Sequence, residues 1–293
     1  MYQGHPFLAL LFALLFICTA ATGKTVYYQR SPTVDDARDV YPIQLLRLAL
    51  DRSGGQYQLK PSAQAMLQGR ALAELAVGRG VDVVWAMTSK EREAALRPIR
   101  IPIFKGLIGW RIPLVRASQA NLFKDIRNLE QLKSLTAGQG HDWPDTDILL
   151  GNGIAVERVA RYQGLFRMLT LGRFDYFPRS MSEIWAEADE HAKDGIVVDR
   201  FVVIHYPTAF YYFVNQRNTE LANAIQSGLE AAIADGSFDK LFYQFHADIL
   251  KRSEIDKRTV IELYNPTLPE KTPLQRRELW LQLDDLKQSG TTH

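Results

Sequence analysis

The chain of 293 residues has little cysteine and little net charge. Its only cysteine is Cys18, which excludes an intramolecular disulfide and a metal site built from several thiolates. Basic and acidic residues number 35 and 33, and no dense basic run is present, so nucleic acid is not an expected partner. The chain also lacks a Gly-x-Ser-x-Gly elbow, a P-loop and a nucleotide-binding glycine fingerprint. We therefore expect no cofactor.

A short apolar run stands near the N-terminus. Residues 7–17 are apolar throughout, which is too short to span a bilayer as a helix but typical of a secretory h-region. Small residues follow the run, so we predict a cleaved signal peptide over residues 1–23. No Lys or Arg precedes the run, and a retained membrane anchor is the alternative. Cleavage would remove the only thiol, which excludes thiol catalysis and suits the oxidising periplasm where we place the protein.

Apolar runs and helical stripes alternate after residue 23. The near-continuous run Val81–Met87 is typical of a parallel strand covered on both faces. Helical spacing of apolar residues predicts helices at 43–50 and 221–233, the second ended by Gly236. A last helix is predicted over 274–287. This alternation predicts an α/β fold with open, mostly parallel sheets flanked by helices.

Three longer stretches carry a resemblance. The first is GRALAELAVGRGVDVVWAMTSKEREAALRPIRIPIF, in which Gly80-Val81-Asp82 enters a strand and Thr88 and Arg92 follow it. The second is LGRFDYFPRSMSEI, and the third is LANAIQSGLEAAIADGSFDKLFYQF. In this order and spacing they resemble the periplasmic solute-binding proteins of the polar amino acid type (family 3, the type II periplasmic binding fold). The likeness covers most of residues 24–246.

The resemblance implies two lobes joined by two crossing strands, near Trp110–Pro113 and Ile204–Thr208. The ligand would lie between the lobes at the carboxyl ends of the strands, and the lobes would close on it by a hinge motion. The implied division of the chain is lobe 1 at residues 24–110 and 208–293, with a helical tail over 266–293, and lobe 2 at residues 111–207. Apolar tail residues such as Leu279 and Trp280 would dock on lobe 1 or on a partner.

Candidate ligand contacts in lobe 1 lie at strand ends. Arg92 matches the family arginine that holds a ligand carboxylate by a two-point contact, which suits guanidinium geometry. The alternative is a solvent-facing arginine in the charged run Lys90–Glu93. Thr88 would donate a hydroxyl beside Arg92 or cap the next helix. Trp85 and Tyr28 are candidates that are equally compatible with core packing.

Candidate contacts in lobe 2 lie in the stretch TAGQGHDWPDTD at 136–147. In the family, a glycine-containing loop leads into a helix whose backbone amides bind the ligand carboxylate, and Gly138-Gln139-Gly140 fits such a loop. Pro144 fits the first helical position. Asp145 and Asp147 then fall in the first turn, where they complement the helix dipole.

The tip of this loop supplies the remaining candidates, namely Gly140, His141, Asp142 and Trp143. Trp143 would stack on a ligand, and Asp142 would pair with a ligand amine. A metal site formed by His141 and the neighbouring acids is an alternative, but it lacks the paired-histidine spacing of helix-borne zinc sites.

Arg179 and Ser180 mark a departure from the family. Amino-acid binders place an aspartate at this point to hold the ligand ammonium, whereas Pro178–Met181 contains no acid. Ser180 and Glu183 have capping-box spacing for a helix from Met181, and Arg179 would attract an anion at its N-terminus. A dicarboxylate, or a solute whose amine is read by Asp142, fits better than an ordinary α-amino acid.

The resemblance implies a monomeric binding protein that performs no chemistry. It would capture a small anionic or zwitterionic solute, amino-acid-like or carboxylate, for an ABC-type transporter. Two alternatives remain. One is a periplasmic ligand sensor acting on a separate membrane receptor. The other is a small-molecule lyase on the same fold, with Asp142 and His141 as acid and base.

Overall fold

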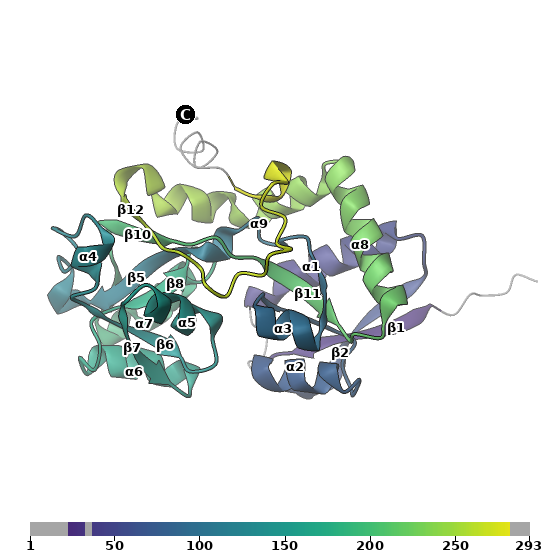
Figure 1. Cartoon of the computed structure of the whole chain (residues 1–293), viewed down its shortest axis with the longest axis horizontal. Helices are drawn as coiled ribbons and strands as arrows, with labels where there is room; N and C mark the ends of the chain where they lie inside the picture. The colour runs from purple at the N-terminus through teal and green to yellow at the C-terminus, as the bar shows by residue number, and fades with distance from the viewer. Residues whose placement is uncertain (1–22, 33–36, 282–293) are drawn as a thin grey trace, which may run out of the picture.

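The computed structural model describes residues 23–32 and 37–281, which form two lobes side by side (Figure 1). The predicted signal peptide lies outside these residues, apart from Gly23. Within the described ranges, no helix combines the length and apolar character needed to cross a membrane. The predicted α/β class is confirmed, because helices flank a mixed sheet in each lobe.

Lobe 1 is built on a five-stranded sheet in the order β2-β1-β3-β11-β4. Strand β1 is parallel to β2 and β3, whereas β11 is antiparallel to β3 and β4. Every residue of β3 is buried, as expected of a strand covered on both faces. The strands of this sheet are β1 (Lys24–Arg30), β2 (Tyr57–Ala65), β3 (Val83–Met87), β4 (Arg97–Ile99) and β11 (Phe210–Val214).

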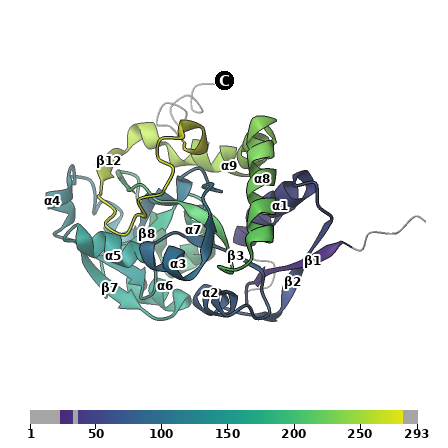
Figure 2. The same cartoon turned by 45° about the vertical axis from the view of Figure 1, so that its right-hand side comes forward.

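Two long helices pack together on lobe 1, where α1 and α8 lie side by side (Figures 1 and 2). Their approach is close because Gly228 has no side chain: a methyl group there would lie 1.8 Å from the Ala49 carbonyl oxygen. The predicted helical stripes at 43–50 and 221–233 are confirmed by these two helices. The lobe 1 helices are α1 (Ala37–Arg52), α2 (Gln68–Ala76), α3 (Lys90–Ala95) and α8 (Thr219–Ala234), followed by α9 (Ser237–Ser253).

Lobe 2 repeats the strand order of lobe 1. Strands β6 and β7 are parallel, and an isolated bridge between Ala137 and Tyr176 joins β6 to the chain just before β8. Strands β8 and β9 are both antiparallel to β5. The order is therefore β7-β6-β8-β5-β9, with an antiparallel fourth strand as in lobe 1. These strands are β5 (Trp110–Arg116), β6 (Thr136–Gly140), β7 (Ala155–Val159), β8 (Phe177–Ser180) and β9 (Ile196–Val198). The helices of lobe 2 are α4 (Leu129–Leu132), α5 (Pro144–Gly151), α6 (Tyr162–Thr170) and α7 (Ile184–His191).

The chain crosses between the lobes at β5 and β10, which pair with each other. Strand β10 (Val202–His205) is antiparallel to β5, with Ile204 opposite Arg111 and His205 opposite Trp110. The indole of Trp110 stacks on the imidazole of His205, with ring centroids 4.0 Å apart. The paired residues of these strands fall within the predicted crossing segments near Trp110–Pro113 and Ile204–Thr208.

The C-terminal part departs from the expected division of the chain. Strand β12 (Thr259–Glu262) pairs in parallel with β10, so it belongs to the second sheet. Assigning all of residues 208–293 to lobe 1 was therefore wrong. The chain then returns to lobe 1, where the backbone N–H of Leu281 donates to the Lys105 carbonyl at 2.9 Å.

The predicted helical tail is also wrong within the described residues. Between 266 and 281 the only helical element is the short 3₁₀ turn η5 (Arg277–Leu279). The segment instead lies along the surface, and the Trp280 indole N–H donates to the Pro273 carbonyl at 2.9 Å. Tertiary contacts of this kind override the helical spacing of the apolar residues. Leu279 is fully buried, so the expected docking of the tail on lobe 1 is confirmed for this part.

Candidate functional site

The candidate site lies where the carboxyl ends of β1 and β3 in lobe 1 meet those of β6 and β8 in lobe 2. Open α/β sheets bind ligands at such edges. The lobes touch here, because a methyl group added to Gly69, in the first turn of α2, would lie 3.0 Å from Asp142 Oδ2. The loop after β6 therefore reaches across the junction to lobe 1.

Arg92 presents an open guanidinium fork at this junction. Its backbone N–H donates to Ser89 Oγ at 3.2 Å, and its Nη1 donates to the Met87 carbonyl at 2.8 Å. Among the described residues, its Nε and Nη2 have no hydrogen-bond partner and it forms no ion pair. Burial lowers the pKa of Arg92, and the carboxylates of Asp142 and Asp145 from lobe 2 oppose this effect. The lobe 2 carboxylates are thus close enough to act on the Arg92 charge.

The Thr88 side chain is hydrogen-bonded within lobe 1. The side chain is 1% exposed, and its hydroxyl donates to Glu93 Oε1 at 2.8 Å. The other oxygen of Glu93 accepts from Arg100 at 2.5 Å. Ser89, not Thr88, caps α3. Thr88 therefore sits beside Arg92 as expected, but its proton is directed to Glu93.

The loop after β6 folds as predicted at its helical end. Pro144 is in the first turn of α5, and Asp145 and Asp147 follow in the same turn, which confirms that prediction. Gly140 is buried, and its carbonyl accepts from Thr146 Oγ1 at 2.8 Å. The side chains of His141 and Asp142 remain 56% and 50% exposed, with Nδ1 and Oδ1 3.8 Å apart. They form the tip of the loop.

Trp143 is partly buried and packs against its own lobe, and its stacking on a ligand stays a prediction. A methyl group on Gly140 would lie 2.5 Å from its indole, so the ring fills space that the glycine leaves empty. The ring also stacks on Phe177, with centroids 6.3 Å apart and planes at 21°. The ring therefore contributes to the packing of lobe 2.

Arg179 is an internal counter-ion, which contradicts its expected role as an anion site. The side chain is 2% exposed. Its Nε and Nη2 each lie 2.6 Å from a carboxylate oxygen of Glu187, and Nη2 lies 3.1 Å from Glu183 Oε2. Burial alone would lower the pKa of Arg179, but these carboxylates outweigh burial and raise the pKa well above its ordinary value.

Ser180 does not cap a helix at Met181, so the capping-box prediction was wrong. It is the last residue of β8, fully buried, and its Oγ accepts from the Ser182 backbone at 3.2 Å. Pairing of Ser180 with Arg111 extends the strand, and α7 begins only at Ile184.

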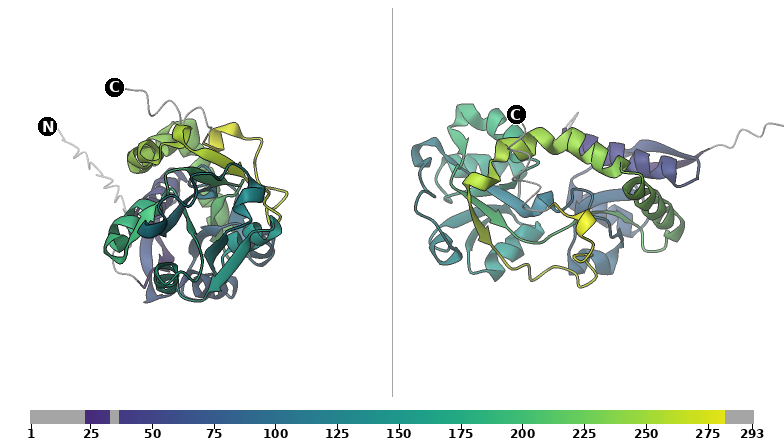
Figure 3. Two further views of the ribbon diagram at one scale, coloured as in Figure 1. Left: turned by 90° about the vertical axis from the view of Figure 1, so that its left-hand side faces the viewer. Right: turned by 90° about the horizontal axis from the view of Figure 1, so that it is seen from above.

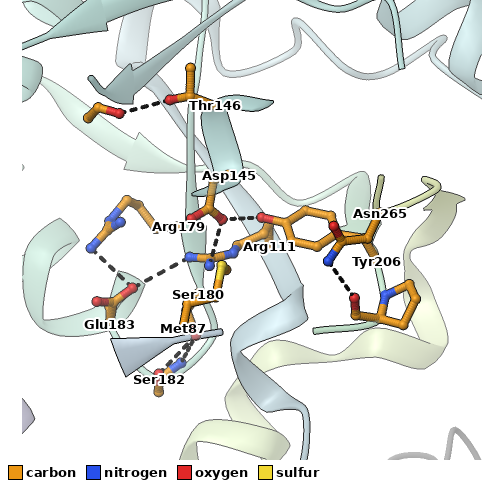
Figure 4. A network of polar contacts seen from close by, with 12 residues as sticks. Met87, Arg111, Asp145, Thr146, Arg179, Ser180, Ser182, Glu183, Tyr206 and Asn265 are labelled. Atoms are coloured by element: carbon orange, nitrogen blue, oxygen red, sulfur yellow. Dashed lines mark hydrogen bonds and ion pairs between the residues drawn. The ribbon is translucent and has the colours of Figure 1, made fainter. Parts of the chain in front are cut away.

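A buried network that the sequence did not predict connects α5 to both crossing segments (Figure 4). Arg111 Nη2 lies 2.7 Å from Asp145 Oδ1, and the Tyr206 hydroxyl donates to the same oxygen. Arg111 Nη1 lies 3.7 Å from Glu183 Oε2, which links this group to Arg179. Arg111 and Asp145 are 4% and 5% exposed. One signal was available, namely the charged Arg111 within the apolar run of β5.

The aromatic candidates of lobe 1 lie in its core. Trp85 is 3% exposed, and its indole N–H donates to Asp39 Oδ1 at 3.2 Å. Tyr28 is half-buried, with its ring 6.0 Å from that of Trp85. Core packing accounts for Trp85, whereas Tyr28 is a partly buried residue at the edge of the same core. In the part of the chain that the structure describes, no group of three or more His, Cys, Asp or Glu is placed to hold a metal ion.

Comparisons with known proteins support the fold. No protein-family model and no curated protein matches the chain. Among solved structures, an ancestral arginine-binding protein bound to arginine has a TM-score of 0.55 at 19% identity, over 76% of this chain and 97% of that one. A histidine kinase sensor domain with similarity to periplasmic binding proteins has a TM-score of 0.54 at 18% identity, over 76% and 95%. An ancestral amino-acid-binding protein, a precursor of cyclohexadienyl dehydratase, has a TM-score of 0.53 at 17% identity, over 75% and 95%.

These matches define the class of fold. The chain has the two-lobed fold of the periplasmic binding proteins. The resemblance found in the sequence is therefore confirmed for the fold.

Proposed function

We propose that this protein is a periplasmic solute-binding protein that captures a small anionic or zwitterionic solute between its lobes for an ABC-type transporter. The open fork of Arg92 carries the proposal. Guanidinium groups bind carboxylates through two parallel N–H···O contacts, and Nε and Nη2 of Arg92 are without a hydrogen-bond partner among the described residues. A partly buried arginine in this state favours a ligand carboxylate.

Asp142 is the proposed contact for the other end of a zwitterionic solute. It stands on lobe 2, reaches α2 of lobe 1 and is half exposed. Arg179, in the position where amino-acid binders place an acid, is already paired with Glu183 and Glu187. A solute with its carboxylate on Arg92 and its amine on Asp142 would contact both lobes, so binding would favour their closure.

Sensing is the second candidate, favoured by the match to a histidine kinase sensor domain. A sensor would use the same ligand contacts and differ in its partner.

A lyase is the weaker candidate. His141 and Asp142, its acid and base, are 56% and 50% exposed, whereas such chemistry favours a site that excludes water.

Thermal unfolding of the chain from Lys24 onward, in the presence of amino acids, dicarboxylates, amines and short peptides, tests the proposal. A solute at about 100 times its Kd adds about 2.7 kcal/mol to the free energy of unfolding, which raises the Tm by several degrees. We expect Arg92→Ala to abolish this rise, because the two-point contact is lost.

Arg97→Ala is the matched control. Arg97 is a partly buried lobe 1 arginine whose Nε donates to the Gln216 carbonyl at 3.0 Å, so this variant should keep the rise in Tm. If the wild type responds to no solute class, or Arg92→Ala responds as the wild type does, the proposal is wrong.

A further inference from the structure

The described chain crosses between the lobes twice more after β10. Helix α9 lies along the top of both lobes (Figure 3, right). Near its C-terminal end, Arg252 Nη2 lies 3.3 Å from Asp189 Oδ1 on α7 of lobe 2. After β12, residues 263–281, which we call the strap, run back to lobe 1 across the junction (Figure 1). The two crossing strands are therefore not the only connections between the lobes.

The strap is anchored to lobe 2 at the C-terminal end of α5. Asn152 Nδ2 donates to the Tyr264 carbonyl at 2.6 Å, and the Tyr264 backbone N–H donates to Asn152 Oδ1 at 3.0 Å. Pro266 packs against Gly151, where a methyl group would lie 2.9 Å from Pro266 Cγ. One side chain thus binds the strap backbone at two points.

The strap is anchored to lobe 1 at the start of α3. The backbone N–H of Lys90 donates to the Thr267 carbonyl at 3.3 Å, and its Nζ donates to the Pro266 carbonyl at 3.1 Å. Between the two anchors, the buried Asn265 donates from Nδ2 to the Pro207 carbonyl at 2.9 Å, and its Oδ1 accepts from the Thr267 backbone at 2.9 Å. Residues 264–267 therefore contact lobe 2, the crossing segment and lobe 1 in turn.

The end of the strap is seated in a turn of lobe 1. Lys105 Nζ donates to the Glu278 carbonyl at 2.6 Å. The Trp280 indole packs on Gly106, where a methyl group would lie 2.6 Å from the ring. The ring can therefore pack on this turn only because residue 106 is a glycine. Arg276 forms two contacts with Glu230 on α8, at 2.6 and 2.9 Å. The strap is thus held on lobe 1 well beyond its crossing point.

We propose that the strap is a tether that limits how far the two lobes open, so that the ligand-free protein keeps them close together. The three peptide units from Tyr264 to Thr267 span at most about 11 Å when fully extended, and both ends are hydrogen-bonded. Opening would separate α3, which carries Arg92, from α5, which follows the 138–143 loop. The anchor at Asn152 or at Lys90 would have to break. The tether does not depend on the identity of the solute.

Spin-label distance measurements test the tether. The chain from Lys24 has no cysteine, so labels at Gln64→Cys on lobe 1 and Glu157→Cys on lobe 2, both exposed positions, are the only thiol labels. A protease recognition sequence is inserted between Asn265 and Pro266, which separates the Asn152 anchor at Tyr264 from the Lys90 anchor at Pro266 and Thr267, and it is cut after folding. We expect a narrow distance distribution in the intact, ligand-free protein, and a shift of more than about 2 Å with broadening after cleavage. An unchanged distribution after cleavage overturns the proposal.

Asn152→Ala provides the same test without an insertion. It removes both lobe 2 hydrogen bonds of the strap, so the distribution should broaden. Arg276→Ala is the matched control because it removes contacts of the strap within lobe 1 only, and it should leave the distribution unchanged. Equal distributions in wild type and Asn152→Ala contradict the tether, as does broadening that is equal in the two variants.

Discussion

Arg179→Met is expected to lower the free energy of unfolding by about 3–5 kcal/mol. The guanidinium neutralises Glu187, which is 4% exposed, and contacts Glu183. Removing it leaves the Glu187 carboxylate buried without its counter-ion, which is far costlier than losing an exposed ion pair. Urea unfolding followed by tryptophan fluorescence, extrapolated linearly to water, measures the change.

Arg252→Met is the control for this prediction. Arg252 pairs with Asp189 at 3.3 Å, but the two side chains are 52% and 68% exposed, so the loss should be below about 1 kcal/mol. The double variant Arg179→Met/Glu187→Met should regain much of the lost stability, because no buried charge is left unpaired. A loss below about 1 kcal/mol in Arg179→Met would show that the network does not hold lobe 2 together.

The stability of the protein should fall as the pH drops from about 6.5 to about 4, partly through His246. This side chain on α9 is 3% exposed, and its ring lies 4.6 Å from those of Tyr41 and Phe242. Burial lowers its pKa to about 4. The unfolded chain, with a pKa of about 6.5, therefore binds the proton first, and stability present above pH 6.5 is lost toward pH 4. At about 1.36 kcal/mol per pH unit, the loss is about 3 kcal/mol.

His246→Phe isolates this contribution from that of the carboxylates. The free energy of unfolding of both proteins is measured from pH 7.5 down to pH 4, and the wild-type curve should fall more steeply by about 3 kcal/mol in total. His141→Ala is the control, because His141 is exposed and the substitution should leave the wild-type slope intact. Parallel curves for His246→Phe and the wild type would contradict the prediction.

Elements governed by local rules could be predicted from the sequence. Strand β3 follows from its apolar run, the end of α8 from Gly236, and the start of α5 from Pro144. The predictions were wrong where pairing with a strand far away in the sequence determines how long a strand is or which sheet it joins. Strand β8 extends to Ser180 because it pairs with Arg111, and β12 joins the second sheet through β10. The local spacing of apolar residues does not reveal either pairing partner.

The features of the candidate site also differ in whether the sequence could predict them. Arg92 and the loop tip at His141 and Asp142 could be nominated from the sequence because the resemblance gives their expected place on the strand ends. The packing of Trp143 beside Gly140 could not be predicted, because the space that its ring fills depends on the fold. The counter-ions of Arg179 could not be chosen from the sequence, since their approach requires β8 and α7 to be in place.

The most direct test of the central claim is a calorimetric titration of the solute identified by thermal unfolding. The solute and its carboxylate ester are each titrated into the wild type and Arg92→Ala. If the carboxylate binds Arg92, esterification and Arg92→Ala each weaken binding, and the two losses are not additive, with a coupling of about 0.5–3 kcal/mol. If Arg92→Ala weakens the ester as much as the free acid, the carboxylate is not bound by Arg92 and the account of the site is wrong.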